Sequence, residues 1–267
     1  MRSNPFALVG SQSVLGSGAA GVPAFPVHIM QRPSFVTILT LSTMTLAAGV
    51  LNSAAQVVEA QTAEALLQRM EATYAGARSY SDTIFVRFRN PDGAEGARAE
   101  CRFWFARPGL FRLDGESRRA EDAPPKREVM WSDGESARSW ATASAVTLRG
   151  KIQLAGSKMF GTYAYHIPTL LERSYGGPRR LHELSVPVLG EEESFEGVNC
   201  YRIRGSWQGD PYEIWIGKDD FLVRKITASY SGYAMEEIHR EIKLNQDIPK
   251  VVFQFAPENE AGTRRRR

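Results

Sequence analysis

Hydrophobic residues recur along this chain with two different periods, and the change of period separates a helix from a long series of strands. Between Thr62 and Gly76 the apolar residues recur at the spacing of one helical turn, and the Thr62 side chain can cap the start of such a helix. From Tyr80 onwards apolar and polar residues alternate, as they do along a half-buried strand. The pattern therefore predicts one N-terminal helix followed by many strands.

Turn signals at Asn90 to Gly93, at Pro108 and at Ser132 to Gly134 divide the chain into short strands. Between residues 150 and 173 the spacing is helical again and predicts one or two short helices, whereas segment 234 to 244 fits either a strand or a helix. Strands and helices do not alternate as they would around a parallel sheet. We therefore expect an α+β, mainly β fold. Its single curved antiparallel sheet is an incomplete barrel of about ten or eleven strands, with helices as a lid over the concave face.

The start of the chain has the composition of an export signal. Residues 33 to 58 contain no charge, follow Arg32 and end in small residues. A positive region, an apolar stretch and a small-residue cleavage site characterise a secretory signal peptide, whereas a retained membrane anchor needs about 20 apolar residues. We expect cleavage near Gln56 or Gln61. Met30 fits the start of this signal better than Met1 does.

The expected organisation is a leader over residues 1–60, one domain over residues 61–257 and a basic tail over residues 258–267. The net charge is +3, and four of the positive charges form the terminal run Arg264 to Arg267. The body is therefore close to neutral and gives no indication of nucleic acid as a partner. A Gly-x-Gly-x-x-Gly match at Gly16 to Gly21 lies in the leader, without the strand and helix that dinucleotide binding requires, so no cofactor is expected.

Few residues could carry catalysis or bind a metal. The histidines are His28, His166, His182 and His239. They lie far apart in the sequence, and none has metal-ligand spacing to a cysteine or a carboxylate. Ser132 and Asp133 fit a turn better than a catalytic triad. We therefore expect no metal site and no enzyme. Cys101 and Cys200 are an even pair, which can form a disulfide in an exported protein or remain as two buried thiols.

The most informative stretch is residues 103 to 111, Phe-Trp-Phe-Ala-Arg-Pro-Gly-Leu-Phe. Alternation places Phe103, Phe105 and Arg107 on one face of a strand. Arg107 then has apolar neighbours, among which an unpaired charge is costly. Two interpretations remain open. Either the strand has ended and Arg107 reaches solvent along the sheet, or its guanidinium binds backbone carbonyls at the end of a helix over the sheet and acts as a latch.

Several short motifs resemble those of the periplasmic lipoprotein carriers of the LolA type. They are Trp104, Arg107-Pro108-Gly109-Leu110-Phe111, Ser132-Asp133-Gly134 with Trp140, and the closing Phe253-Gln254-Phe255-Ala256-Pro257. Together with the N-terminal helix, the resemblance covers residues 61 to 257. It implies an incomplete β-barrel whose helices form a lid over an apolar cavity that receives acyl chains.

The resemblance also implies roles for residues: Arg107 would latch the lid, and Phe111 would line the mouth of the cavity. We expect Phe103, Phe105 and Trp131 to line the same cavity, because they lie on strands near the shared turn. The expected function is that of a periplasmic, non-enzymatic carrier or binder of acyl chains, lipid or lipoprotein, as in outer-membrane lipoprotein sorting. The alternative is an envelope interaction or sensor protein that uses the same scaffold to bind a protein partner, such as a membrane-associated one.

Overall fold

The computed structural model of the chain describes residues 61–119, 123–142, 144–150, 166–175, 181–230 and 232–257. These residues all belong to one compact unit, residues 57–267. The predicted leader, its cleavage site, the start at Met30 and the basic tail lie outside the described residues. Within the described part, no helix is long and apolar enough to cross a membrane.

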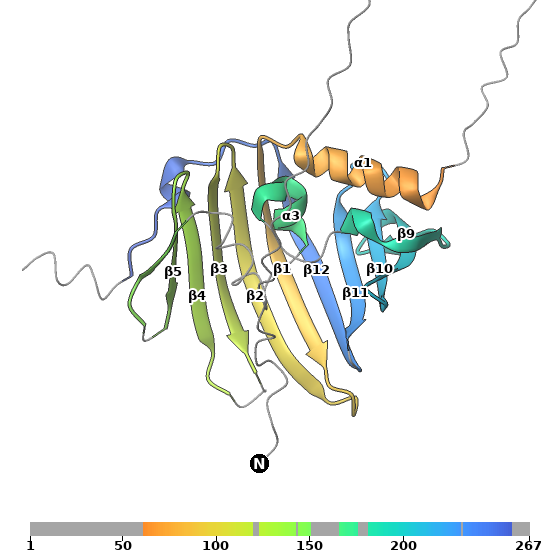
Figure 1. Cartoon of the computed structure of the whole chain (residues 1–267), viewed down its shortest axis with the longest axis horizontal. Helices are drawn as coiled ribbons and strands as arrows, with labels where there is room; N and C mark the ends of the chain where they lie inside the picture. Colours follow the sequence, from red (N-terminus) through yellow and green to blue (C-terminus); the bar gives the residue numbers. More distant parts are fainter. Residues whose placement is uncertain are drawn as a thin grey trace, which may run out of the picture. The chain divides into compact units, whose positions relative to one another are not determined.

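The described residues form one antiparallel sheet of twelve strands and two α-helices (Figure 1). The strands are β1 (Ser79–Arg89), β2 (Glu95–Ala106), β3 (Leu110–Arg118), β4 (Lys126–Asp133), β5 (Ala137–Ala141), β6 (Thr147–Gly150), β7 (Ser185–Leu189), β8 (Glu193–Phe195), β9 (Val198–Trp207), β10 (Asp210–Gly217), β11 (Val223–Tyr230) and β12 (Tyr233–Leu244). The helices are α1 (Ala63–Ala75) and α3 (Ile167–Leu171), and the 3-10 turns are η1 (Arg173–Tyr175), η2 (Leu181–Glu183) and η3 (Lys250–Phe253).

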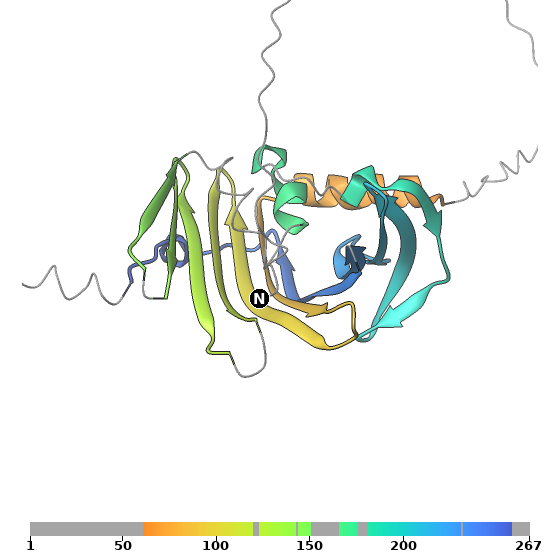
Figure 2. The same ribbon diagram turned by 60° about the horizontal axis from the view of Figure 1, so that its bottom comes forward.

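The strand order in the sheet is β6-β5-β4-β3-β2-β1-β12-β11-β10-β9-β7, with β8 paired to β9. The sheet is therefore two meanders joined by the pairing of β1 with β12, and its end strands β6 and β7 are not paired with each other. Figure 2 shows the sheet curving around the side that carries the helices. The predicted mainly β fold with one open, curved antiparallel sheet is confirmed, with twelve described strands in place of ten or eleven. Segment 234 to 244, which fitted either element, is a strand.

Helix α1 begins and ends where the sequence predicts. The Thr62 hydroxyl accepts a hydrogen bond from the Ala65 amide at 3.1 Å, and the chain leaves the helix at Gly76. The apolar stripe of α1 is buried, because it faces the concave side of the sheet (Figures 1 and 2). Its hydrophobic burial, rather than the intrinsic propensity of 13 residues, therefore holds the helix in place.

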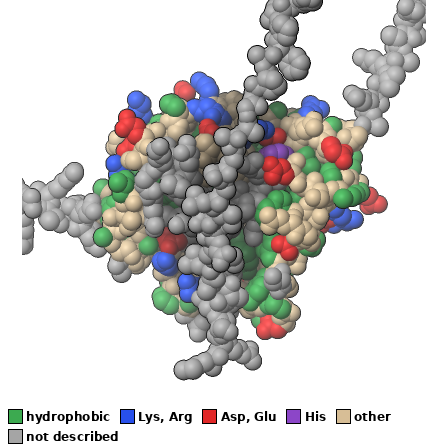
Figure 3. Space-filling view, viewed as in Figure 1, with side chains coloured by type: hydrophobic (Ala, Val, Ile, Leu, Met, Phe, Trp, Pro, Cys, Tyr) green, Lys and Arg blue, Asp and Glu red, His purple; other side chains and the backbone are tan. Residues whose placement is uncertain are grey.

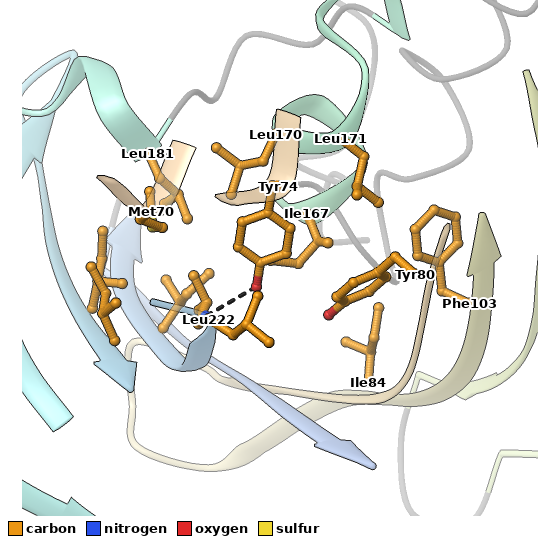
Figure 4. Packing of buried hydrophobic residues seen from close by; sticks show 14 of the residues in the cluster. Met70, Tyr74, Tyr80, Ile84, Phe103, Ile167, Leu170, Leu171, Leu181 and Leu222 are labelled. Carbon is orange, nitrogen blue, oxygen red and sulfur yellow. Dashed lines mark hydrogen bonds between the residues drawn. The ribbon is translucent and has the colours of Figure 1, made fainter. Parts of the chain in front are cut away.

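The main hydrophobic core fills the space between the helices and the concave face. Figure 4 shows Tyr74 of α1 and Leu171 of α3 directed toward Tyr80, Ile84 and Phe103 of the sheet. The buried Tyr74 hydroxyl accepts a hydrogen bond from the Val223 amide at 3.0 Å, at the start of β11. The two helices thus close the concave side by inserting side chains into it.

Candidate ligand-binding site beneath the helical lid

A single arginine joins both helices to the sheet. Arg107 directly follows β2, and its Nε donates a hydrogen bond to the carbonyl of Ala77 at 3.0 Å. Its Nη2 donates to the carbonyl of Ala75 at 2.8 Å and to that of Leu171 at 2.6 Å, and its Nη1 donates to Glu172 Oε2 at 3.1 Å. Ala75 ends α1 and Leu171 ends α3. We define α1, α3 and η1 together as the lid.

The Arg107 guanidinium binds here because the carbonyl groups at the end of a helix need hydrogen-bond donors. The last carbonyls of a helix lack partners within it and carry a partial negative charge, which a planar guanidinium with five N–H donors can satisfy at several points. The Arg107 side chain is 36% exposed, so solvent screens part of this attraction. Burial would raise the pKa of Glu172, but hydrogen bonds from Ser174 and the charge of Arg107 outweigh it and lower that pKa. Arg107 therefore has the geometry of the second of the two interpretations, in which it binds helix carbonyls.

Three of the aromatic residues singled out in the sequence lie directly beneath the lid. Phe103, Phe105 and Phe111 are completely buried on the concave face. Tyr175 of the lid meets two of them edge-on, with ring centroids 6.2 Å from Phe105 and 5.5 Å from Phe111. Lid and sheet are thus in aromatic contact close to Arg107.

Trp131 is not part of this surface, so its prediction as a cavity residue was wrong. Its neighbour Met130 is directly opposite Leu113, and both belong to the core beneath the lid. Alternation therefore turns Trp131 to the other face, where its ring lies 5.1 Å from that of Phe255. Which residues of β4 face the lid depends on the register of β4 against β3, and the turn between the two strands sets this register. The alternating pattern of β4 alone does not determine it.

The possible disulfide between Cys101 and Cys200 is not formed, and both residues are buried thiols. Cys101 lies on β2 and Cys200 on β9, with β1, β12, β11 and β10 between them in the sheet. Neighbouring strands lie about 4.8 Å apart, whereas a disulfide requires Cα atoms within about 7 Å. Burial raises the pKa of both thiols.

A chain of buried polar side chains, which the sequence pattern did not predict, crosses the core beneath the lid. His166, at the start of α3, has Nδ1 2.8 Å from Glu237 Oε2 on β12. Glu237 Oε1 lies 3.1 Å from His239 Nε2, and His239 Nδ1 lies 2.7 Å from Asp82 Oδ2 on β1. The Tyr80 hydroxyl donates to the same Asp82 oxygen at 2.8 Å. None of the five side chains is more than 4% exposed.

The pKa values within this chain follow from its alternation of acids and bases. Burial lowers the pKa of His239, but hydrogen bonds to Asp82 and Glu237 outweigh it and raise that pKa to about 9. Burial raises the pKa of Glu237, but the charge and hydrogen bond of His166, together with His239, lower it to about 2. Burial raises the pKa of Asp82 above its usual value, against the hydrogen bond from His239. Glu237 and His239 are therefore a buried ion pair near neutral pH.

One signal could have identified these residues. Asp82, Ile84 and Val86 are alternate residues of β1, so their side chains share one face of the strand. Alternation therefore places the Asp82 carboxylate on the buried face. A buried carboxylate requires a partner. Glu237 and His239 share one face of β12. Because segment 234 to 244 also fitted a helix, the sequence did not determine whether these two side chains face the core. Among the described residues, no group of three or more His, Cys, Asp or Glu side chains could hold a metal ion.

Taken together, these features define an open, curved antiparallel sheet whose apolar concave face is covered by a helical lid. No protein-family model and no curated protein matches the sequence. Solved structures do match. LprF from Mycobacterium bovis has a TM-score of 0.44 and 10% identity, over 70% of this chain and 94% of LprF. The lipoprotein LppX from Mycobacterium tuberculosis has a TM-score of 0.43 and 11% identity, over 70% of this chain and 97% of LppX.

A LolA superfamily protein from Nitrosomonas europaea has a TM-score of 0.34 and 13% identity, over 73% of this chain and 99% of that protein. The likeness is one of fold, in the arrangement of sheet and helices.

Proposed function

We propose that the protein is a periplasmic carrier or binder of acyl chains, lipid or lipoprotein, and that the ligand is held between the concave face of the sheet and the lid. The observation that carries this proposal is the position of Arg107, where one side chain fastens the ends of both lid helices. This contact is partly exposed to solvent, so it can open without disrupting the sheet, whose strands pair independently of it.

The composition of the concave face supports an apolar ligand. Removing apolar surface from water contributes about 25 cal/mol for each Å² buried, and an acyl chain presents only such surface. In the closed structure the lid itself supplies this cover, since Met70 and Tyr74 of α1 are completely buried against the core. Ligand and lid therefore compete for the same surface, and binding shifts the population toward an open lid.

Binding of a dansyl-labelled undecanoic acid to the mature chain, beginning at Gln61, tests the proposal. Phe111→Ala removes a buried ring beneath the lid, and Trp131→Ala removes a buried ring of the opposite face. We expect Phe111→Ala to weaken fatty-acid binding about tenfold, as for the loss of about 1.4 kcal/mol of apolar contact. Trp131→Ala should change it less than twofold.

Analysis of lipid that co-purifies with the protein provides the second readout. Acyl lipid extracted from freshly purified protein supports the proposal. Absence of both co-purified lipid and fatty-acid binding would contradict it, and a protein captured in its place would favour the envelope interaction or sensor function. N-terminal sequencing of the exported material should find a start near Gln56 or Gln61.

A further inference from the structure

The convex face of the sheet, away from the lid, carries a row of three arginines. Arg87 on β1 is directly opposite Arg98 on β2, and Arg98 is directly opposite Arg118 on β3. They alternate with Val86 and Ala99, which belong to the core beneath the lid. Side chains directly opposite each other in a sheet have Cβ atoms about 5 Å apart, and like charges at this distance destabilise the pairing. The row therefore weakens the sheet instead of stabilising it.

Neighbouring acids neutralise little of this charge. Arg118 has an ion pair with Glu116, at the long distance of 3.6 Å. Glu236 is directly opposite Arg87 on β12, but its carboxylate pairs with Lys225 at 3.0 Å. The side chains of Arg87 and Arg98 make no ion pair or hydrogen bond with the residues that the structure describes.

The row borders a trough of about 960 Å³ on the same face. Six arginines and three acidic residues line the trough, so its charge is positive. Arg102, on β2, is a further exposed member without an ion pair to the described residues, and Trp104 and Phe85 add aromatic surface. Val252, in η3, contributes to the wall. On the opposite face, which Figure 3 shows, acidic and basic side chains are interspersed around the rim.

We propose that this arginine trough is a docking surface for an acidic polypeptide segment of a partner protein. Arginine binds carboxylates through paired, charge-assisted hydrogen bonds, and arginine and tryptophan are enriched where protein interfaces derive most of their affinity. A recess admits an extended chain, whereas a planar membrane surface would contact protruding charges. The arginines that weaken the sheet would then be stabilised by the carboxylates of the partner.

Fluorescence anisotropy with a labelled twelve-residue peptide of alternating Glu and Ser tests this surface. We expect Arg98→Gln and Arg102→Gln each to weaken peptide binding about threefold, and the double variant about tenfold. Arg204→Gln is the matched control, because Arg204 is an exposed arginine of the sheet outside this trough and is paired with Glu213. It should leave binding within twofold of wild type, and added salt should weaken the wild-type complex.

Thermal melting separates binding from a structural role. Arg98→Gln removes the like-charge contacts of the row, so we expect the melting temperature to rise by about 1 °C while peptide binding weakens. A lower melting temperature with unchanged peptide binding would assign Arg98 to the fold and overturn the proposal. Equal losses for Arg204→Gln would also overturn it, as would binding to phosphatidylglycerol vesicles without binding to the peptide.

Discussion

The imidazole of His166 lies 2.8 Å from the carboxylate of Glu237, and neither side chain is more than 2% exposed. This contact ties the start of α3 to β12 at the inner side of the lid, whereas Arg107 ties its end at the outer side. The two contacts differ in their exposure to solvent: the His166–Glu237 pair is buried, whereas the Arg107 side chain is partly exposed.

Replacing His166 should therefore destabilise the protein strongly. His166→Leu leaves the buried Glu237 with one imidazole partner instead of two, and we expect a loss of about 3 kcal/mol in the free energy of unfolding. Urea denaturation measures this loss, and hydrogen exchange should show faster exchange at residues 166–175. His182→Leu is the control, because the His182 ion pairs are long, at 3.6 and 3.7 Å. Equal losses for the two variants would contradict the assignment.

Stability should depend on pH through the same buried chain. The pKa of His239 is raised from 6.5 to about 9, so its contribution is complete below pH 6.5 and is lost as the pH rises through 9. The pKa of Glu237 is lowered from 4.5 to about 2, so its contribution is complete above pH 4.5 and is lost as the pH falls through 2. Both are complete between pH 4.5 and 6.5. The raised pKa of Asp82 also favours the folded state at lower pH.

The measurement is urea denaturation at pH 6 and pH 9.5. We expect the free energy of unfolding to fall by about 3 kcal/mol across this interval, and the fall to be much smaller in His239→Gln. Parallel profiles for the two proteins would show that another group is responsible.

Arg107 should affect both stability and ligand release. Arg107→Leu removes two hydrogen bonds to the ends of the lid helices and two to Ala77 and Glu172, which follow those helices; because the side chain is partly exposed, we expect a loss of about 2 kcal/mol. A bound fatty acid should leave more slowly, since reclosure of the empty lid no longer competes with binding. Stopped-flow release of a dansyl-labelled acid measures this rate. Melting temperature and release that both match wild type would return Arg107 to the role of a solvated strand end.

The two cysteines should be unreactive in the folded protein. Both thiols are buried and outside any disulfide, and burial raises their pKa values. Dithiothreitol should therefore leave the melting temperature unchanged, and Ellman's reagent should react with both thiols only after unfolding in guanidinium. A melting temperature that falls on reduction would indicate a disulfide.

The elements that the sequence predicted well are those in which local pattern and burial agree. The period of 3.6 between Thr62 and Gly76 corresponds to α1, and the turns at Asn90 and Pro108 separate β1, β2 and β3. The position of Arg107 beside helix carbonyls agrees with one of the two interpretations that alternation left open.

The remaining features depend on pairing across long stretches of sequence. The face of Trp131 is fixed by the register of β4 against β3, and the meeting of His166 with Glu237 requires a lid placed over β12. Neither is encoded in a local period. The histidines lie far apart in the sequence, but the fold brings His166 and His239 to the same carboxylate, that of Glu237.

The pairing of β1 with β12 has a consequence for the order in which the molecule forms. Every other strand pair lies within one of the two meanders, so each meander can form from segments that are near each other in the sequence. The edge of β1 that receives β12 remains open until β12, the last of the described strands, is available, and an open edge invites pairing with other chains. Asp82 lies on β1 and its partner His239 on β12, so the same step that closes the edge also brings these two buried side chains together. Strand β12, the last of the described strands, thus covers the edge of β1, the first of them.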